Sequence, residues 1–275
     1  MTREALTAST DALRAAGIDE PRLDAELLLA AATGWDRARL IADSEAEIPP
    51  AASRRFAEMV RRRLRREPVA YILGRRGFRR LELAVDPRVL IPRPETELLV
   101  ELALEVDPAS VLDVGTGSGA IALAIADELP RCAVTAVDTS AAALELARLN
   151  AERAGLASRV DFALGTLPPT KGGFELVVAN LPYVSEAEWD GLQPEVREWE
   201  PREALLAGAD GLDAIRAVVP ALAGSAEVLA LEVGAGQAGA VGELLFAAGF
   251  GAIETRADLA GIARVVIGRG EASVA

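Results

Sequence analysis

From Ser110 onward, short apolar segments alternate regularly with longer amphipathic ones. Apolar segments of this kind are typical of strands whose two faces are both buried, and the amphipathic segments between them are typical of helices. The expected strands are 111–115, 133–138, 159–164, 174–180 and 227–233, and the clearest helices are 118–129 and 140–154. The sequence therefore predicts an α/β fold, with a mostly parallel sheet covered by helices on both sides.

The end of the chain departs from this alternation. Segments 252–259 and 263–269 both read as strands, and no helical segment separates them. Two strands joined by a short connection pair in the antiparallel sense. We therefore expect them to form an antiparallel pair at the edge of the sheet.

The N-terminal part has a different character. Residues 24–32 form a strong helical pattern that ends at Thr33-Gly34, and a second helix is expected between Pro49-Pro50 and Glu67-Pro68. Apolar residues at 78–85 and 89–91 flank Asp86-Pro87, which predicts a hairpin. We expect a small helical domain at 1–74, a hairpin linker at 75–94 and the α/β domain at 95–275.

Composition excludes several kinds of site. The chain has no histidine, which rules out histidine-based catalytic pairs and metal centres, and its single cysteine, Cys132, is too isolated for a zinc site. No metal is therefore expected. No apolar run is long enough to span a bilayer, and no leader is visible, so we expect a cytoplasmic protein and no membrane partner.

Charge is distributed unevenly along the chain. Residues 1–94 carry 18 arginines and 14 acidic residues, a net charge of +4, whereas the rest of the chain has a net charge of −17. The segment Arg54 to Arg80 alone holds 11 arginines. This segment could bind RNA or an acidic protein surface, or it could be the solvated face of a helix.

A glycine-rich turn follows the first strand of the α/β part. It reads Asp113-Val-Gly-Thr-Gly-Ser-Gly119, and the second strand ends in Asp138, where a carboxylate could take both hydroxyls of a ribose. The turn formally satisfies the dinucleotide pattern. However, a carboxylate at Asp113 would repel a pyrophosphate but could accept a hydrogen bond from an ammonium group. This favours S-adenosylmethionine over NAD, a flavin or a turn with no ligand.

Asn180-Leu-Pro-Tyr follows the fourth strand. The nitrogen of a planar amide is a poor nucleophile because its lone pair is delocalised. The Asn180 side-chain oxygen and a neighbouring backbone carbonyl could accept both N–H bonds of an –NH2 group and direct the lone pair at a methyl donor. Pro182 stiffens the turn, and Tyr183 offers a face for a planar group. The alternative is a tight turn with an aromatic cover.

Together these motifs resemble the bacterial release-factor glutamine methyltransferases, over about residues 66–269. The matching segments are 68–74, 89–97 with its Ile-Pro-Arg-Pro-Glu-Thr-Glu stretch, the turn at 113–119, the Asn180 motif, 199–201, Gly211-Leu212 and 264–269. The resemblance implies a seven-strand, Rossmann-like S-adenosylmethionine-dependent methyltransferase sheet, with a small N-terminal helical domain joined to it by a β-hairpin. It also implies a helical domain that docks class 1 peptide chain release factors and a catalytic domain that methylates N5 of the glutamine in their Gly-Gly-Gln loop.

The resemblance also assigns roles to positions. The catalytic residues would be Asn180, Pro182 and Tyr183. The cofactor-binding residues would be Asp113, Gly115, Thr116, Gly117, Ser118, Gly119, Asp138, Leu167 and Asn180. The substrate-binding residues would be Pro92, Arg93, Glu95, Thr96, Asn180, Leu181, Pro182 and Tyr183. For Thr96 and Glu97, simply joining the hairpin to the next helix is an equally good interpretation.

Two positions depart from the family pattern. Leu181 stands where the family has proline, and Asn-Leu-Pro-Tyr is also found in ribosomal RNA adenine dimethylases. Gly165-Thr166-Leu167 lacks the aspartate that the family usually places near the adenine, although Leu167 could still cover the ring.

Two other functions therefore remain open: an N6-adenine methyltransferase acting on RNA or DNA, and a silent cofactor-binding scaffold. The charge of −17 on the catalytic part argues against a nucleic-acid substrate. We expect a monomer.

Overall fold

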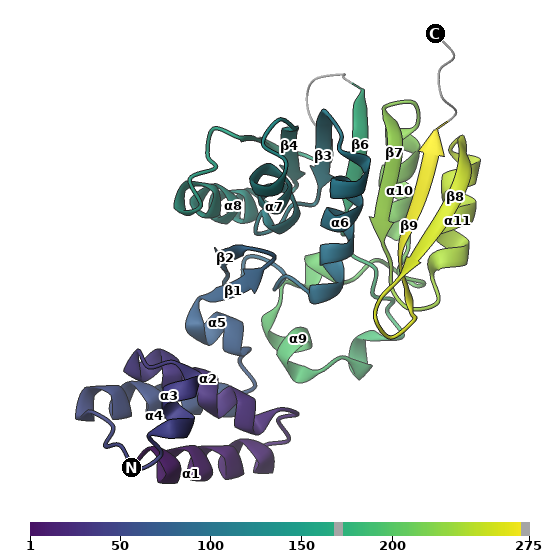
Figure 1. The fold of residues 1–275 in the computed structure, drawn as a ribbon. Coiled ribbons are helices and arrows are strands. Elements are labelled where there is room, and N and C mark those ends of the chain that lie inside the picture. The colour runs from purple at the N-terminus through teal and green to yellow at the C-terminus, as the bar shows by residue number, and fades with distance from the viewer. Residues whose placement is uncertain (168–172, 271–275) are drawn as a thin grey trace. The chain divides into compact units, whose positions relative to one another are not determined.

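The computed structural model describes residues 1–167 and 173–270, which form two compact units (Figure 1). The first unit contains Met1–Arg75 together with the distant segment Gln193–Trp199. The second contains Arg76–Leu192 and the chain from Glu200 onward.

The first unit is helical. Its helices are α1 (Thr2–Ala15), α2 (Pro21–Thr33), α3 (Arg37–Ala42), α4 (Pro50–Leu64), α5 (Val69–Leu73) and, from the distant segment, α9 (Pro194–Trp199). Helix α2 ends at Gly34, which adopts the left-handed conformation with φ +73°, and α4 begins at Pro50, as the sequence predicted. Leu13, Leu28 and Phe56 belong to the buried core of this unit.

A buried ion-pair cluster anchors α9 within the first unit. Arg63 of α4 binds Asp24 through Nε at 2.7 Å and Glu195 of α9 through Nη2 at 2.7 Å. Arg66 binds the second oxygen of Glu195 at 2.6 Å. The Arg63 side chain is only 7% exposed, so its charge is balanced almost entirely by these carboxylates.

A two-stranded hairpin consists of β1 (Arg75–Phe78) and β2 (Leu81–Ala84). The predicted hairpin is therefore present, but its turn was predicted at the wrong place. The chain reverses at Arg79, which has φ +51°, and Val89–Ile91 is not a strand. Arg79 is held there because its guanidinium binds Glu128 and its backbone N–H donates to Glu97.

Seven strands form one sheet in the described part of the second unit, in the order β5-β4-β3-β6-β7-β9-β8. Their bounds are β3 (Ser110–Val114), β4 (Ala133–Asp138), β5 (Val160–Leu164), β6 (Phe174–Ala179), β7 (Ala226–Glu232), β8 (Phe250–Ala257) and β9 (Ala263–Gly270). Strands β3 to β7 are parallel, whereas β9 runs antiparallel to both β7 and β8. The parallel sheet and its antiparallel edge are thus confirmed.

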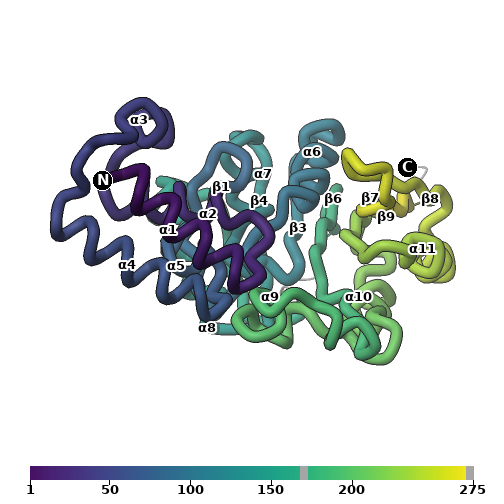
Figure 2. The backbone as a smooth tube through the Cα atoms, turned by 90° about the horizontal axis from the view of Figure 1, so that it is seen from below, coloured from purple at the N-terminus to yellow at the C-terminus, as the bar shows by residue number. Residues whose placement is uncertain are grey.

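Helices cover both faces of this sheet. They are α6 (Glu97–Val106), α7 (Ala120–Glu128), α8 (Ala141–Arg153), α10 (Asp213–Leu222) and α11 (Ala238–Ala247), with short 3-10 helices η1 (Pro94–Thr96), η2 (Trp189–Gly191) and η3 (Arg202–Ala204). Figure 2 shows α6 and α7 on one side of the strands and α10 and α11 on the other. Alternate residues of β3 point to the two faces: Val111 packs with α6 and α7, whereas Leu112 packs with α10 and α11.

The strand order reverses at β3, which lies between β4 and β6. In open α/β sheets, ligands bind beyond the carboxyl ends of the strands at such a point. The turn after β3, Asp138 at the end of β4 and Asn180 after β6 are therefore brought to one edge of the sheet.

Candidate active site

The turn between β3 and α7 is shaped by its glycines. Gly115, Gly117 and Gly119 have φ values of +76°, +55° and +83°. A side chain at Gly119 would also meet Leu123 at 3.0 Å. The alternating glycines therefore let the backbone turn into α7 while Thr116 and Ser118 stay nearly buried.

Asp113 lies beneath this turn. Its Oδ2 accepts hydrogen bonds from the Thr116 hydroxyl at 2.6 Å and from Ala122 N–H at 3.2 Å. Burial raises the pKa of Asp113 to about 7, and its Oδ1 has no hydrogen-bond partner in the described part of the chain. In this structure Asp113 holds the turn from below, and its contact with an ammonium group stays a prediction.

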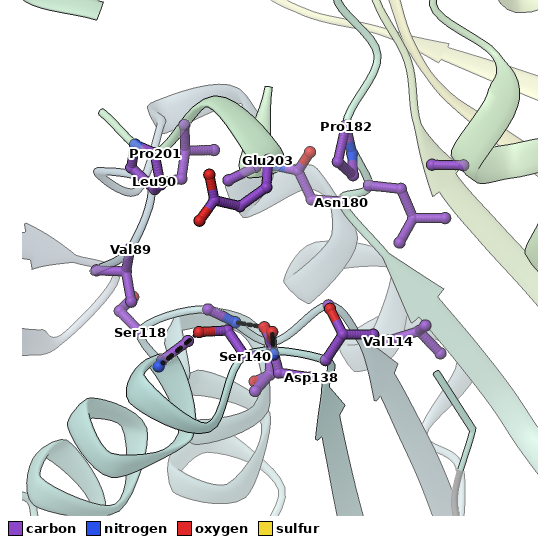
Figure 3. A pocket seen from close by; sticks show the side chains of 18 of the residues that line it. Val89, Leu90, Val114, Ser118, Asp138, Ser140, Asn180, Pro182, Pro201 and Glu203 are labelled. Carbon is purple, nitrogen blue, oxygen red and sulfur yellow. Dashed lines mark hydrogen bonds between the residues drawn. The ribbon is translucent and has the colours of Figure 1, made fainter. Parts of the chain in front are cut away.

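The Asp138 carboxylate accepts hydrogen bonds from the segments that follow two neighbouring strands, β3 and β4. Its Oδ2 accepts from Gly117 N–H at 2.8 Å, and its Oδ1 accepts from Ser140 N–H at 2.8 Å. These two bonds fix the carboxylate on the wall of the cavity (Figure 3). Each carboxylate oxygen has a further lone pair, so Asp138 can still accept hydrogen bonds from a diol.

Asn180 follows β6 and faces the same space. Its Nδ2 donates to the Thr96 hydroxyl at 3.1 Å, so the other side of the amide presents Oδ1 as an acceptor. Leu181 and Pro182 continue along the cavity wall. Tyr183 is not part of that wall. Burial raises its pKa to about 12, and its carbonyl accepts from Gln237 Nε2 at 2.9 Å.

The segment before α6 is fastened by Glu200. The buried Glu200 carboxylate accepts from Ile91 N–H at 2.9 Å and also binds the Arg93 guanidinium. This contact fixes the chain on both sides of Pro92. Sequence reasoning matched Glu200 to the family pattern but gave it no role at the site. The pattern alone could not reveal which backbone group it would bind.

These elements enclose a cavity of about 330 Å³ inside the second unit. Figure 3 shows Asp138 and Ser140 on one side of it, and Asn180 and Pro182 on the other. The predicted site residues on its wall are Pro92, Thr96, Gly115, Thr116, Gly117, Ser118, Asp138, Asn180, Leu181 and Pro182. The predicted residues outside the wall are Arg93, Glu95, Asp113, Gly119, Leu167 and Tyr183.

Sequence reasoning missed several residues of the wall. Glu203 of η3 points its carboxylate into the cavity (Figure 3), and Val89 and Leu90 form an apolar side. The sequence pattern predicts a strand at Val89 and Leu90, so these residues were not expected on the cavity wall. Thr166 lines the cavity where the family pattern has an acid.

Several arginines of the arginine-rich segment pair with nearby acids. Arg61 pairs with Glu58, Arg62 with Glu67, and Arg63 and Arg66 with Glu195. In the second unit Arg79 and Arg80 share Glu128. Part of the basic stretch is thus engaged in ion pairs in the structure, which reduces the positive field that RNA binding needs.

Within residues 1–167 and 173–270, no group of three or more acidic or cysteine side chains is arranged to hold a metal ion. No helix in the same ranges is long and apolar enough to cross a membrane.

Residues 4–74 match the family described as the PrmC N-terminal domain, and residues 111–199 match a methyltransferase domain. The release factor glutamine methyltransferase of Moorella thermoacetica is 45% identical over 256 residues, which cover 90% of each chain. That of Geobacter sulfurreducens is 44% identical, covering 92% of this chain and 91% of the relative. Among solved structures, the hMettl16 catalytic domain in complex with a MAT2A 3′UTR hairpin has a TM-score of 0.57 at 13% identity, over 71% of this chain and 77% of that one. The last likeness shows the fold alone.

Proposed function

The chain belongs to the release factor glutamine methyltransferase family, and we propose that it transfers a methyl group from S-adenosylmethionine to N5 of the glutamine in the Gly-Gly-Gln loop of class 1 release factors. The observation that carries this proposal is the placement of Asn180. Its amide is fixed by Thr96 and lies on the wall of the same cavity as Asp138 and the glycine turn.

The cavity fits the cofactor in its chemistry. Asp138 offers carboxylate lone pairs to the ribose hydroxyls, and Gly115, Gly117 and Ser118 bring backbone close to the ligand. The apolar Val89 and Leu90 can cover a planar base. When bound, S-adenosylmethionine supplies a methyl group on a positively charged sulfur.

The protein's contribution to the reaction is orientation. Oδ1 of Asn180 and a backbone carbonyl of the Asn-Leu-Pro-Tyr turn accept the two N–H bonds of the substrate amide. Asp138 and the glycine turn would hold S-adenosylmethionine, which would supply the methyl group for the new N–C bond and would keep the electron pair of its C–S bond on sulfur. The methylated nitrogen loses one proton to water. This needs no histidine, since rate is gained from positioning in a site with little water.

Leucine at position 181, where the family has proline, is compatible with this arrangement. Its side chain is only 7% exposed and packs close to Gly115, and its backbone carbonyl is kept. We propose that leucine here fills space that proline fills in relatives, without changing the acceptors of the amide.

The first unit is proposed to dock the release factor, with the enzyme acting as a monomer in the cytoplasm, where translation terminates. An RNA or DNA substrate is disfavoured by the charge of −17 after residue 94 and by the ion pairs of the arginine-rich segment. The low-identity likeness to an RNA-bound catalytic domain adds no argument for RNA.

The direct experiment incubates the enzyme with tritiated S-adenosylmethionine and a full-length class 1 release factor. The matched control is the same release factor with the Gly-Gly-Gln glutamine replaced by alanine. We expect label only in the first sample. Equal labelling of both samples would place the methyl elsewhere and refute the assigned substrate atom.

A further inference from the structure

Gln237 directly precedes α11, and the mechanism above does not use it. Its Nε2 donates to the Tyr183 carbonyl at 2.9 Å and, over a longer 3.3 Å, to the Asp210 carbonyl. Its Oε1 accepts from Gly234 N–H at 2.8 Å. One side chain therefore joins three segments of the second unit: the turn that follows β6, the loop before α10 and the turn that follows β7.

The orientation of the Gln237 amide is fixed by its partners. A backbone carbonyl can only accept a hydrogen bond, and a backbone N–H can only donate one. The NH2 group must therefore face the carbonyls of Tyr183 and Asp210, and the oxygen must face Gly234. A rotated amide would lose all three contacts, so this side chain has one satisfied orientation.

Two glycines let Gln237 approach the turn closely. A Cβ at Gly211 would lie 2.2 Å from the Tyr183 carbonyl oxygen and 2.6 Å from Gln237 Nε2. A Cβ at Gly234 would lie 2.9 Å from Gln237 Oε1 and 3.2 Å from Cδ2 of the Tyr183 ring. A larger residue at either position would displace this contact, which gives a structural reason for Gly211 in the family pattern.

The Asn-Leu-Pro-Tyr turn is therefore held at both ends. At its start, the pairing of β6 with β3 and β7 extends to Ala179. At its end, Gln237 holds the Tyr183 carbonyl, and the next residue, Val184, donates its N–H to the Leu205 carbonyl at 2.8 Å. Between these anchors lie the carbonyls of the turn, one of which accepts an N–H bond of the substrate amide under the proposed function.

We propose that Gln237 is a positioning residue for methyl transfer: by holding the Tyr183 carbonyl, it keeps the backbone acceptor of the Asn-Leu-Pro-Tyr turn where the substrate amide meets the methyl donor. This inference rests on the proposed function, since it concerns the second acceptor beside the Asn180 side chain. Gln237 lies outside the cavity wall, so it acts through the backbone of the turn and not by touching a ligand.

Loss of this anchor should slow the reaction more than it weakens binding. Displacement of a reacting group by about 1 Å lowers a rate by as much as about a hundredfold. The hydrogen bonds that fix Asp138 beside the glycine turn do not involve Gln237, so the cofactor Kd should stay as in the wild type. The KM for the release factor should change little, because docking is proposed for the first unit.

The test uses the full chain and a full-length release factor. Gln237→Met keeps the length of the side chain and removes all three hydrogen bonds, whereas Gln237→Glu keeps an acceptor for Gly234 and removes both donors. We expect each variant to lower the single-turnover rate constant about tenfold to a hundredfold, with the cofactor Kd unchanged.

Arg216→Met is the matched control. It breaks the ion pair between Arg216 of α10 and the Asp210 side chain, in the same loop, and leaves Gln237 in place. Its rate should match that of the wild type, because an exposed ion pair contributes little. The comparison separates loss of the Tyr183 anchor from general loosening of the loop.

Hydrogen exchange measured by mass spectrometry tests the anchor without turnover. In Gln237→Met, the backbone N–H groups of 180–190 should exchange about fivefold to tenfold faster than in the wild type, as expected when hydrogen bonds of modest strength are lost. Strands β6 and β7 should keep wild-type exchange, which shows that the sheet stays folded.

Unchanged exchange at 180–190, wild-type rates in both Gln237 variants, or an equal loss of rate in Arg216→Met would each overturn the inference. Absence of methyl transfer by the wild-type enzyme would instead refute the proposed function. The exchange comparison does not depend on that transfer, so the two failures are distinguishable.

Discussion

Replacing Asn180 with alanine removes the side-chain acceptor of the substrate amide and little else. The side chain is half-buried and makes one hydrogen bond, to the Thr96 hydroxyl. The loss of one such bond changes the free energy of unfolding by only about 1 kcal/mol. Loss of an orienting hydrogen bond at a reacting group in a site with little water, in contrast, raises the barrier by about 3–4 kcal/mol, or roughly 10²–10³ in rate.

The assay is single-turnover methyl transfer to the release factor at saturating cofactor, with the cofactor Kd measured separately by calorimetry. We expect the single-turnover rate constant to fall by about two to three orders of magnitude, with the cofactor Kd within about threefold of wild type. Asn180→Asp is the matched control: it keeps the shape but loses the donor to Thr96 and adds a charge beside Glu232, so it should not rescue turnover. A turnover of Asn180→Ala within tenfold of wild type would refute the account of amide orientation.

Four further results are expected. Asp138→Ala should weaken cofactor binding by about tenfold to a hundredfold in calorimetry, because contacts to a carboxylate contribute about 1.5–3 kcal/mol; an unchanged Kd would move the ribose contact elsewhere. Gly211→Ala should lower the free energy of unfolding by about 2–4 kcal/mol in urea, because φ is +77° and a Cβ would lie 2.2 Å from the Tyr183 carbonyl oxygen; wild-type stability would contradict this geometry. Arg63→Ala should destabilise the first unit by about 3–5 kcal/mol, because it leaves the buried Asp24 carboxylate without its cation, whereas Glu195 keeps Arg66; a loss below about 1 kcal/mol would show that the cluster is solvated. Burial raises the pKa of Glu232 from 4.5 to about 7, so the folded state binds a proton that the unfolded state has lost, and stability should fall as the pH rises through that range. Glu232→Gln should reduce this slope in thermal melts and leave the part that comes from Asp113, whose pKa burial also raises to about 7; an unaltered slope would assign it to groups other than Glu232.

Much of the catalytic fold could be predicted because its signals are local. An apolar run such as 174–180 and a helix stop such as Gly34 can be recognised from a few neighbouring residues. The structure has strand β6 and the end of helix α2 at these places. The glycine turn and Asn180 could be located for the same reason. Parallel strands bring their carboxyl ends to one edge, so short motifs far apart in sequence were expected to meet.

Contacts between distant residues could not be predicted in this way. The hairpin turn at Arg79 depends on Glu128 and Glu97, which no local pattern near residue 79 reveals. The inclusion of α9 in the first unit depends on the pairing of Glu195 with Arg63 and Arg66. Similarly, no local pattern reveals that the Asp113 carboxylate accepts from the Thr116 hydroxyl beneath the turn, while its contact with an ammonium group stays a prediction.

The site of methyl transfer tests the central claim most directly. The enzyme is incubated with isotopically labelled S-adenosylmethionine and a mixture of release factor and total RNA, and the label is located by mass spectrometry in both fractions. We predict one labelled methyl on the side-chain nitrogen of the Gly-Gly-Gln glutamine and none in RNA. Label on N6 of adenine, with an unmodified release factor, would contradict the account and show that the Asn-Leu-Pro-Tyr turn serves a nucleic-acid base.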